Sequence, residues 1–173
     1  MHTLVPRRLT PEGFGPYGEV LHFDAGRSWL VNGGKALRAN TAARFDRAAP
    51  AEPVLAVYRS TGEPWPLRVD LLERHPDSSQ AFVALSVEHF LVVVAPQDGP
   101  GRPDLRRAEA FVGRRGEGIN YLRNVWHAPI RAIGSDGDFL MFMWERGTPD
   151  DCIVHPTREP LLVDGFSPTM EQD

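Results

Sequence analysis

Glycine and proline interrupt this chain so often that long helices are excluded. Sixteen of each are spread over 173 residues. They divide the sequence at intervals of about eight to twelve residues, the spacing of an all-β sandwich or barrel. Most segments between them are rich in Val, Ile, Phe or Tyr, which favour strands. We therefore predict strands at Val54–Tyr58, Arg68–Glu73, Gln80–Leu85, Phe90–Ala95, Ala108–Val112, Gly118–Tyr121, Ile130–Ile133 and Phe139–Trp144.

This number of strands within little more than a hundred residues suits a double-sheeted jelly roll. An immunoglobulin-type sandwich is the alternative, but the Cys…Trp…Cys framework of that fold is missing. Helix is expected only as a short turn over Thr10–Phe14, started by Pro11, and as a brief helix within Asp104–Ala110. We expect a turn at Pro149–Asp151, one domain over residues 1–166, and a frayed tail over residues 167–173.

Composition narrows the class of protein. A net charge of −4 provides no concentrated basic face for nucleic acid. The longest apolar run, Phe90–Pro96, is too short to span a membrane, and no apolar signal segment is visible at the N-terminus. Cys152 is the only cysteine, so no intrachain disulfide can form and a reducing compartment is favoured. These features predict a soluble cytoplasmic protein with a passive thiol.

A first polar segment ends one of the predicted strands. Because side chains alternate along a strand, Glu73 and His75 point to one face and Arg74 points to the other. Gln80 opens the next strand after a turn and can line the same cavity mouth. Imidazole and carboxylate together suit a divalent transition metal. The amide of Gln80 can serve as a weak fourth ligand or as a neighbouring hydrogen-bonding group.

A second polar segment, Gly118–Pro129, follows about forty residues later and can supply His127 to the same site. An imidazole can act as ligand, acid or base. Trp126 suits packing on the core, whereas Asn120, Tyr121 and Arg123 can contact a small oxygenated ligand. Arg59 ends another predicted strand, where it can either bind a carboxylate or remain solvated.

The two segments resemble those of the ureidoglycolate lyase family. The matching stretches are Leu72–Pro76 with Gln80–Phe82, and Gly118–Pro129. Weaker similarity extends from about Leu9 to Phe166. The resemblance implies a cupin-type β-barrel, a homodimer, and release of urea from (S)-ureidoglycolate to leave glyoxylate in allantoin and purine nitrogen catabolism. It also implies a divalent metal, with nickel the ion usually named.

Given that substrate, the chemistry of the polar side chains suggests a role for each. Glu73, His75 and His127 become the catalytic group and, with Gln80, the metal ligands. The expected substrate contacts are Arg59, Gln80, Asn120, Tyr121 and Arg123. The usual cupin pattern has a His-x-His pair and a later Glu, whereas here Glu73 takes the first His position and Gln80 takes the Glu position. Two alternatives stay open: another metal-dependent cupin enzyme, such as a dioxygenase or isomerase, and a non-catalytic cupin that binds a small acid.

Overall fold

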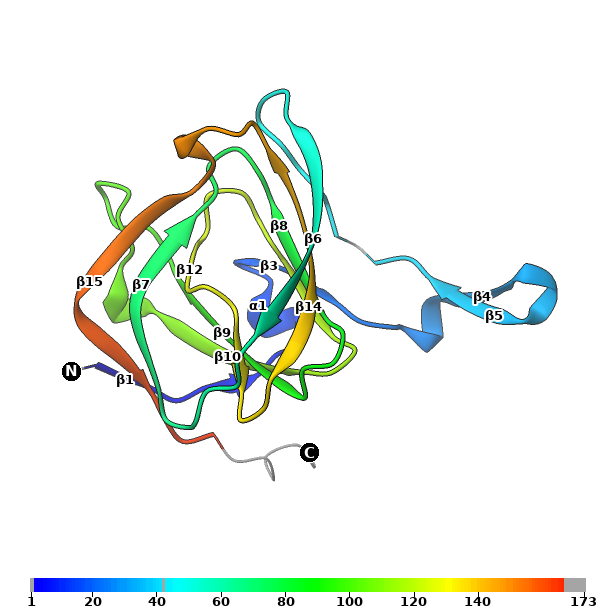
Figure 1. Ribbon diagram of the computed structural model, residues 1–173, viewed down its shortest axis with the longest axis horizontal. Helices are drawn as coiled ribbons and strands as arrows, with labels where there is room; N and C mark the ends of the chain where they lie inside the picture. The colour runs from blue at the N-terminus through cyan, green and yellow to red at the C-terminus, as the bar shows by residue number, and fades with distance from the viewer. Residues whose placement is uncertain (1, 42, 167–173) are drawn as a thin grey trace.

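The computed structural model describes residues 2–41 and 43–166. Its strands form two curled sheets that face each other as a half-barrel, with a separate hairpin that projects from the body (Figure 1). This architecture confirms the predicted all-β jelly roll of cupin type. The predicted tail, residues 167–173, lies outside the described residues.

The larger sheet, which we call sheet A, has eight strands. They are β1 (His2–Leu4), β2 (Arg7–Arg8), β7 (Leu67–Arg74), β9 (His89–Ala95), β10 (Glu109–Arg114), β12 (Trp126–His127), β13 (Arg131–Ile133) and β15 (Ile153–Val163). Their order across the sheet is β1-β15-β7-β12-β9-β10-β2, with β13 also paired to β9. The pairs β1–β15 and β10–β2 are parallel, and the other pairs of this sheet are antiparallel.

The smaller sheet, sheet B, has five antiparallel strands in the order β3-β11-β8-β14-β6. They are β3 (Gly18–Leu21), β6 (Glu52–Ser60), β8 (Gln80–Ala84), β11 (Gly118–Tyr121) and β14 (Gly137–Glu145). The projecting hairpin consists of β4 (Ser28–Val31) and β5 (Ala36–Ala39). All eight predicted strands are present, and their ends differ from the prediction by at most two residues.

Helical structure is short, as predicted. Helix α1 (Pro11–Phe14) begins after Thr10, whose hydroxyl accepts a hydrogen bond from the Gly13 amide. Single 3₁₀ turns lie at η1 (Ala25–Arg27), η2 (Asn32–Gly34), η3 (Leu105–Arg107) and η4 (Pro149–Asp151). The brief helix predicted within Asp104–Ala110 is therefore one 3₁₀ turn, capped by Asp104.

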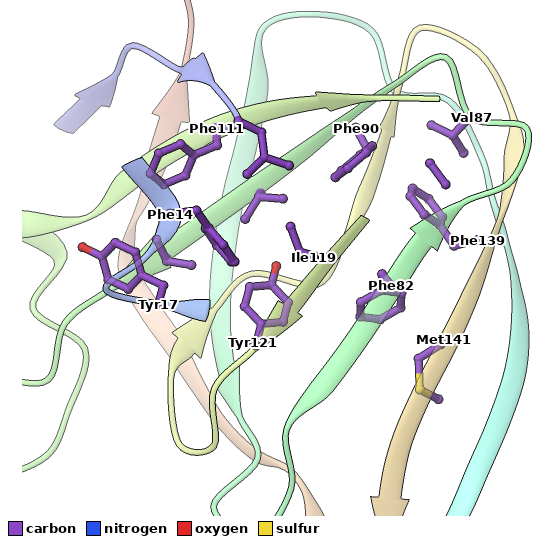
Figure 2. Close-up of a cluster of buried hydrophobic side chains, with 14 of the residues drawn as sticks. Phe14, Tyr17, Phe82, Val87, Phe90, Phe111, Ile119, Tyr121, Phe139 and Met141 are labelled. Carbon is purple, nitrogen blue, oxygen red and sulfur yellow. The ribbon is translucent and has the colours of Figure 1, made fainter. Parts of the chain in front are cut away.

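Two hydrophobic clusters lie on the two faces of sheet A. Along β9, Val92 and Val94 belong to the cluster between the sheets, while Leu91 and Val93 belong to the second cluster. This double burial explains why β9 is continuously apolar. The cluster between the sheets is aromatic, with Phe14, Phe82, Phe90, Phe111, Phe139 and Tyr121 drawn together (Figure 2). In the described part of the chain, no helix is long and apolar enough to cross a membrane.

Candidate active site

Glu73, His75 and His127 converge inside the half-barrel, where one ligand atom from each lies within 4.8 Å of the others. Glu73 is near the end of β7, and His75 follows that strand directly. In β12, His127 is the register partner of Glu73. The predicted convergence of the two polar segments is therefore confirmed for these three residues.

A tight loop between β11 and β12 brings the second segment to the first. Asn124 adopts a left-handed conformation with φ of 68°, which Asn tolerates better than most residues. Its backbone N–H donates to the carbonyl of His75 at 2.9 Å. The loop is thus fastened to the residue after β7, and His127 is carried to the side of Glu73.

Both imidazoles have one ring nitrogen committed to a backbone carbonyl. Nδ1 of His75 lies 2.7 Å from the carbonyl oxygen of Asp151, and Nδ1 of His127 lies 2.9 Å from that of Val125. A carbonyl oxygen can only accept, so each Nδ1 carries the proton and donates it. Each Nε2 then presents a lone pair to the site, which is the tautomer that metal-binding histidines adopt.

The opposite sheet supplies one more oxygen. Gln80, the first residue of β8, places Oε1 3.2 Å from Nε2 of His127, and Oε1 of Glu73 lies 3.6 Å from the same nitrogen. Nε2 of His75 is buried without a hydrogen-bond partner among the described residues. Lone pairs at such distances require a shared proton or a cation between them. The donor set of two imidazoles, a carboxylate and an amide oxygen fits a divalent transition metal.

The electrostatics of the cluster keep Glu73 charged. Burial works to raise the pKa of the Glu73 carboxyl, but the hydrogen bond and charge that His127 offers when it is protonated, together with the charge of His75, lower it below its ordinary value. The pKa of His75 is lowered, first by burial and then by repulsion from His127. An ionised carboxylate beside an unprotonated imidazole is the state that ligates a cation.

Tyr121 supports His127 from the hydrophobic side. The two rings stack at 4.0 Å between centroids and 16° between planes. The phenol oxygen points into the hydrophobic cluster (Figure 2), is buried, and has no hydrogen-bond partner among the residues described. Burial raises the pKa of Tyr121, and the nearby charge of Glu73 adds to the effect. Tyr121 is therefore placed to orient an imidazole.

Two neighbours of Glu73 were not predicted from the sequence. The Sγ of Cys152 lies 3.6 Å from Oε2 of Glu73, and burial, followed by the Glu73 charge, raises the pKa of the thiol to about 11. Tyr58 lies on β6 with its ring packed against Phe82. Burial and then the charge of Glu73 raise its pKa, so it remains a hydrogen-bond donor at neutral pH. The only sequence feature that could have identified Tyr58 as a site residue is strand alternation, which turns Tyr58 inward and Arg59 outward.

Three predicted substrate contacts lie elsewhere. Arg59 is paired with Asp138 through two hydrogen bonds, and its side chain is 83% exposed. Strand alternation turns it outward, because its neighbour Tyr58 packs inward against Phe82. The structure therefore does not bring Arg59 to the cluster.

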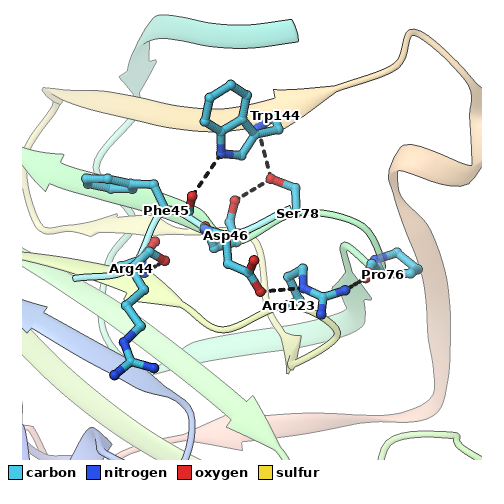
Figure 3. Close-up of polar contacts among 9 residues, drawn as sticks. Arg44, Phe45, Asp46, Pro76, Ser78, Arg123 and Trp144 are labelled. Atoms are coloured by element: carbon cyan, nitrogen blue, oxygen red, sulfur yellow. Dashed lines mark hydrogen bonds and ion pairs between the residues drawn. The ribbon is translucent and has the colours of Figure 1, made fainter. Parts of the chain in front are cut away.

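Asn120 and Arg123 hold a covering segment in place instead. The Asn120 amide donates to Glu19 and to the carbonyl of Arg44. Arg123 donates to the carboxylate of Asp46 at 2.7 Å and to the carbonyl of Pro76 (Figure 3). Both side chains thus fasten residues 44–46 to the body.

The outward-facing residues of the two polar segments behave as alternation predicts. Arg74 lies over the ring of Trp126 at 4.6 Å and donates to the carbonyl of Gly101. The Trp126 ring N–H donates to the same oxygen, and the ring belongs to the second hydrophobic cluster. The packing role predicted for Trp126 is confirmed.

A jelly-roll half-barrel that gathers two imidazoles, a carboxylate and an amide around one point is a cupin-type protein with a group of side chains that could hold a metal. Comparison with known proteins specifies the family within that class. The sequence profile of the ureidoglycolate lyase family matches residues 1–164. The chain therefore belongs to the ureidoglycolate lyase family.

Individual relatives agree with the family assignment. A protein of Pseudomonas syringae pv. tomato named ureidoglycolate lyase is 36% identical over 156 residues, covering 90% of each chain. A protein of the same name from Pseudomonas fluorescens (strain Pf0-1) is 37% identical over 160 residues, covering 92% of this chain and 94% of the relative. One from Mesorhizobium japonicum is 39% identical over 144 residues, covering 82% and 85%.

Proposed function

We propose that this protein cleaves (S)-ureidoglycolate into glyoxylate and urea, and that the Glu73–His75–His127 cluster carries the reaction. The observation that supports this site best is the set of lone pairs that converge without a proton among them: Nε2 of both histidines, Oε1 of Glu73 and Oε1 of Gln80. Family membership supplies the substrate.

The residues that would hold a divalent metal, for which the resemblance suggests nickel, are Glu73, His75 and His127, with Gln80 as the weakest ligand. Imidazole and carboxylate donors suit nickel, iron and zinc better than calcium or magnesium. When bound, such an ion lowers the pKa of a coordinated hydroxyl and orients the carbon that bears it.

The reaction itself needs one proton to move. The hydroxyl of ureidoglycolate loses its proton, its electron pair forms the glyoxylate C=O, the C–N bond breaks, and the urea nitrogen gains a proton. We assign this transfer to Oε2 of Glu73, which contacts Cys152 rather than His127. Glu73 is ionised and can accept the hydroxyl proton, then return it to the departing nitrogen, so that no net proton is released. Both ring nitrogens of His127 are already committed to Val125 and to the cluster.

Residues around the cluster can position the substrate. Tyr58 is half-buried beside Glu73 and offers a phenol proton to the ureido oxygen. The thiol of Cys152 donates to Glu73 and orients its carboxylate. The half-exposed Tyr58 and the Glu73 side chain, which is 21% exposed, mark where substrate enters.

A urea-release assay with racemic ureidoglycolate tests the proposal. The metal-loaded protein should release urea and glyoxylate in equal amounts, and a chelator should stop the reaction. His75→Ala and His127→Ala should fold, lose bound metal and lose activity. Oxygen consumption would indicate a dioxygenase instead, and binding without turnover would indicate a non-catalytic cupin.

The resemblance also implies pairing of the chain with itself, and we propose that the protein is a homodimer. Exposed apolar side chains on both the projecting hairpin and sheet B support this assembly.

A further inference from the structure

The hairpin β4–η2–β5, residues Ser28–Ala39, stands apart from both sheets, and we call it the arm. Within the described residues its two strands pair with each other and with no other strand. Figure 1 shows it extending away from the body on the side where β6 and β14 lie. A two-stranded hairpin alone is at best marginally stable in water. The arm therefore needs a surface to pack on.

The arm carries apolar side chains on both of its faces. Leu30 and Leu37 are register partners on one face, where they are 66% and 54% exposed. Trp29 lies on the other face beneath the guanidinium of Arg38. Exposed leucines placed opposite each other on a pleated surface form a compact patch for contact with another apolar surface.

The roots of the arm hold it away from its own body. The chain enters the arm after β3, which is paired with β11 in sheet B. It returns through Arg44–Asp46, where the carbonyl of Arg44 accepts from Asn120 and the carbonyl of Phe45 accepts from the indole of Trp144 at 3.2 Å (Figure 3). Because both roots are fastened to sheet B, the arm is directed outward.

The outer face of sheet B presents a second apolar surface, which the Phe45 ring covers only in part where it packs against Phe142. Leu55 and Val57 on β6 are 67% and 64% exposed, and the register places them beside Phe142 and Leu140 of β14. A shallow cavity of about 280 Å³ opens on this face, and its lining is entirely apolar: Leu21, Phe45, Leu55, Ala81, Val83, Leu140 and Phe142.

We propose that two copies of this chain exchange arms, so that the Leu30–Leu37 face of each arm packs on Leu55, Val57 and Phe142 of the other copy. This inference rests on the proposed homodimer and specifies its interface. A twofold axis would relate two identical contacts, each formed by the arm of one chain and sheet B of the other. The dimer would then bury both apolar surfaces of both chains, as an isologous interface requires.

Charge favours the exchange over a direct contact between bodies. The arm contains Lys35 and Arg38 and no acidic residue, and neither cation forms an ion pair with a described carboxylate. The whole chain has a net charge of −4 and the arm has a charge of +2, so the rest of the chain has a net charge of −6. Opposite net charges attract each arm to the partner's body, whereas the two bodies alone repel each other.

Sedimentation velocity of the full chain at micromolar concentrations tests the inference. The wild type should be a dimer. Leu30→Glu/Leu37→Glu in the arm and Val57→Glu on sheet B should each weaken dimerisation at least ~100-fold, because each introduces charge into both contacts of the dimer. Val5→Glu is a matched control, since Val5 is also 66% exposed but lies outside the arm and sheet B; this variant should remain a dimer.

Mixing the two weakened variants gives the sharper test. A pair of one arm variant and one Val57→Glu variant retains one unaltered arm-on-sheet contact, so the mixture should form heterodimers that neither variant forms with itself. A monomeric wild type would contradict both the homodimer and the arm exchange. A dimeric wild type whose variants stay dimeric, or a mixture that stays monomeric, would contradict the arm exchange alone. Metal content and urea release, measured on the monomeric variants, report separately on the lyase function.

Discussion

Oε1 of Gln80 lies 3.2 Å from Nε2 of His127, and this contact joins sheet B to sheet A inside the half-barrel. His127 donates through Nδ1 to Val125, so both atoms of the contact are acceptors unless a cation or an added proton lies between them. The contact between Gln80 and His127 therefore lies both between the two sheets and within the candidate metal site.

Replacing Gln80 tests this relationship. Gln80→Leu should lower metal affinity roughly 10- to 100-fold, because an oxygen that faces the cluster is lost. Gln80→Glu should retain the metal, because it restores an oxygen at the same place. Isothermal titration of the metal-free protein with Ni²⁺ measures both affinities, with circular dichroism as the control for folding. Equal affinity in all three proteins would remove Gln80 from the site.

Substitutions of Tyr121 test whether this residue supports the His127 ring or contacts the substrate. Tyr121→Phe should leave stability unchanged or increase it by up to about 1 kcal/mol, because the buried hydroxyl is unpartnered and its desolvation is then avoided. Tyr121→Ala should cost about 3–5 kcal/mol and loosen His127. Urea denaturation measures both values. A raised KM in Tyr121→Phe would show instead that the hydroxyl contacts substrate.

Neighbouring residues on β6 provide a matched pair. Tyr58→Phe should reduce kcat/KM roughly tenfold, the effect of one lost hydrogen bond, with no change in bound metal. Arg59→Gln, one residue away on the outward side, should change kcat/KM less than about twofold because its partner is Asp138 and it lies outside the site. The reverse order of effects would restore Arg59 as the substrate contact.

The Asp46–Arg123 pair predicts a pH-dependent stability. The hydrogen bond and charge of Arg123 lower the pKa of the Asp46 carboxyl. A lowered folded-state pKa contributes stability above the ordinary Asp value and loses it as pH falls through the folded pKa. Arg123→Gln should therefore cost about 0.5 kcal/mol at neutral pH, a small value because both side chains are partly exposed, and nothing near pH ~2.

Denaturation curves at both pH values measure this difference, and Asp46→Asn should reproduce it. A cost for Arg123→Gln that is the same at both pH values would assign its effect to the Pro76 carbonyl rather than to Asp46.

Much of the fold could be predicted because local patterns agree with it. β14 alternates buried and half-buried residues from Gly137 to Met143, and β9 is apolar throughout. β15 was missed because Pro156 and Pro160 argue against a strand; the structure accommodates them at a register shift between Pro156 and Leu161. The arm was missed because its strands, four residues each, flank an Asn-Gly-Gly turn with little apolar pattern.

Some residues of the site could likewise be predicted from local patterns, whereas others could not. Alternation along one strand was enough to separate Glu73 and His75 from Arg74. It could not show which face of β6 points into the half-barrel, so Arg59 was selected in place of its inward-facing neighbour Tyr58. Nor could it show which side of sheet B Asn120 occupies. These choices depend on register between strands distant in sequence. The carbonyl of Asp151, which fixes His75, is a backbone group with no sequence signal.

Metal-dependent urea release shows whether the Glu73–His75–His127 cluster carries the reaction. Protein freed of metal is titrated with Ni²⁺, and urea formed from ureidoglycolate is measured at each step. We expect the rate to rise from near zero to a plateau at one ion per chain, and we expect His127→Ala to show neither binding nor urea release. Full activity in the metal-free protein, or an unchanged rate in folded His127→Ala, would contradict this role of the cluster.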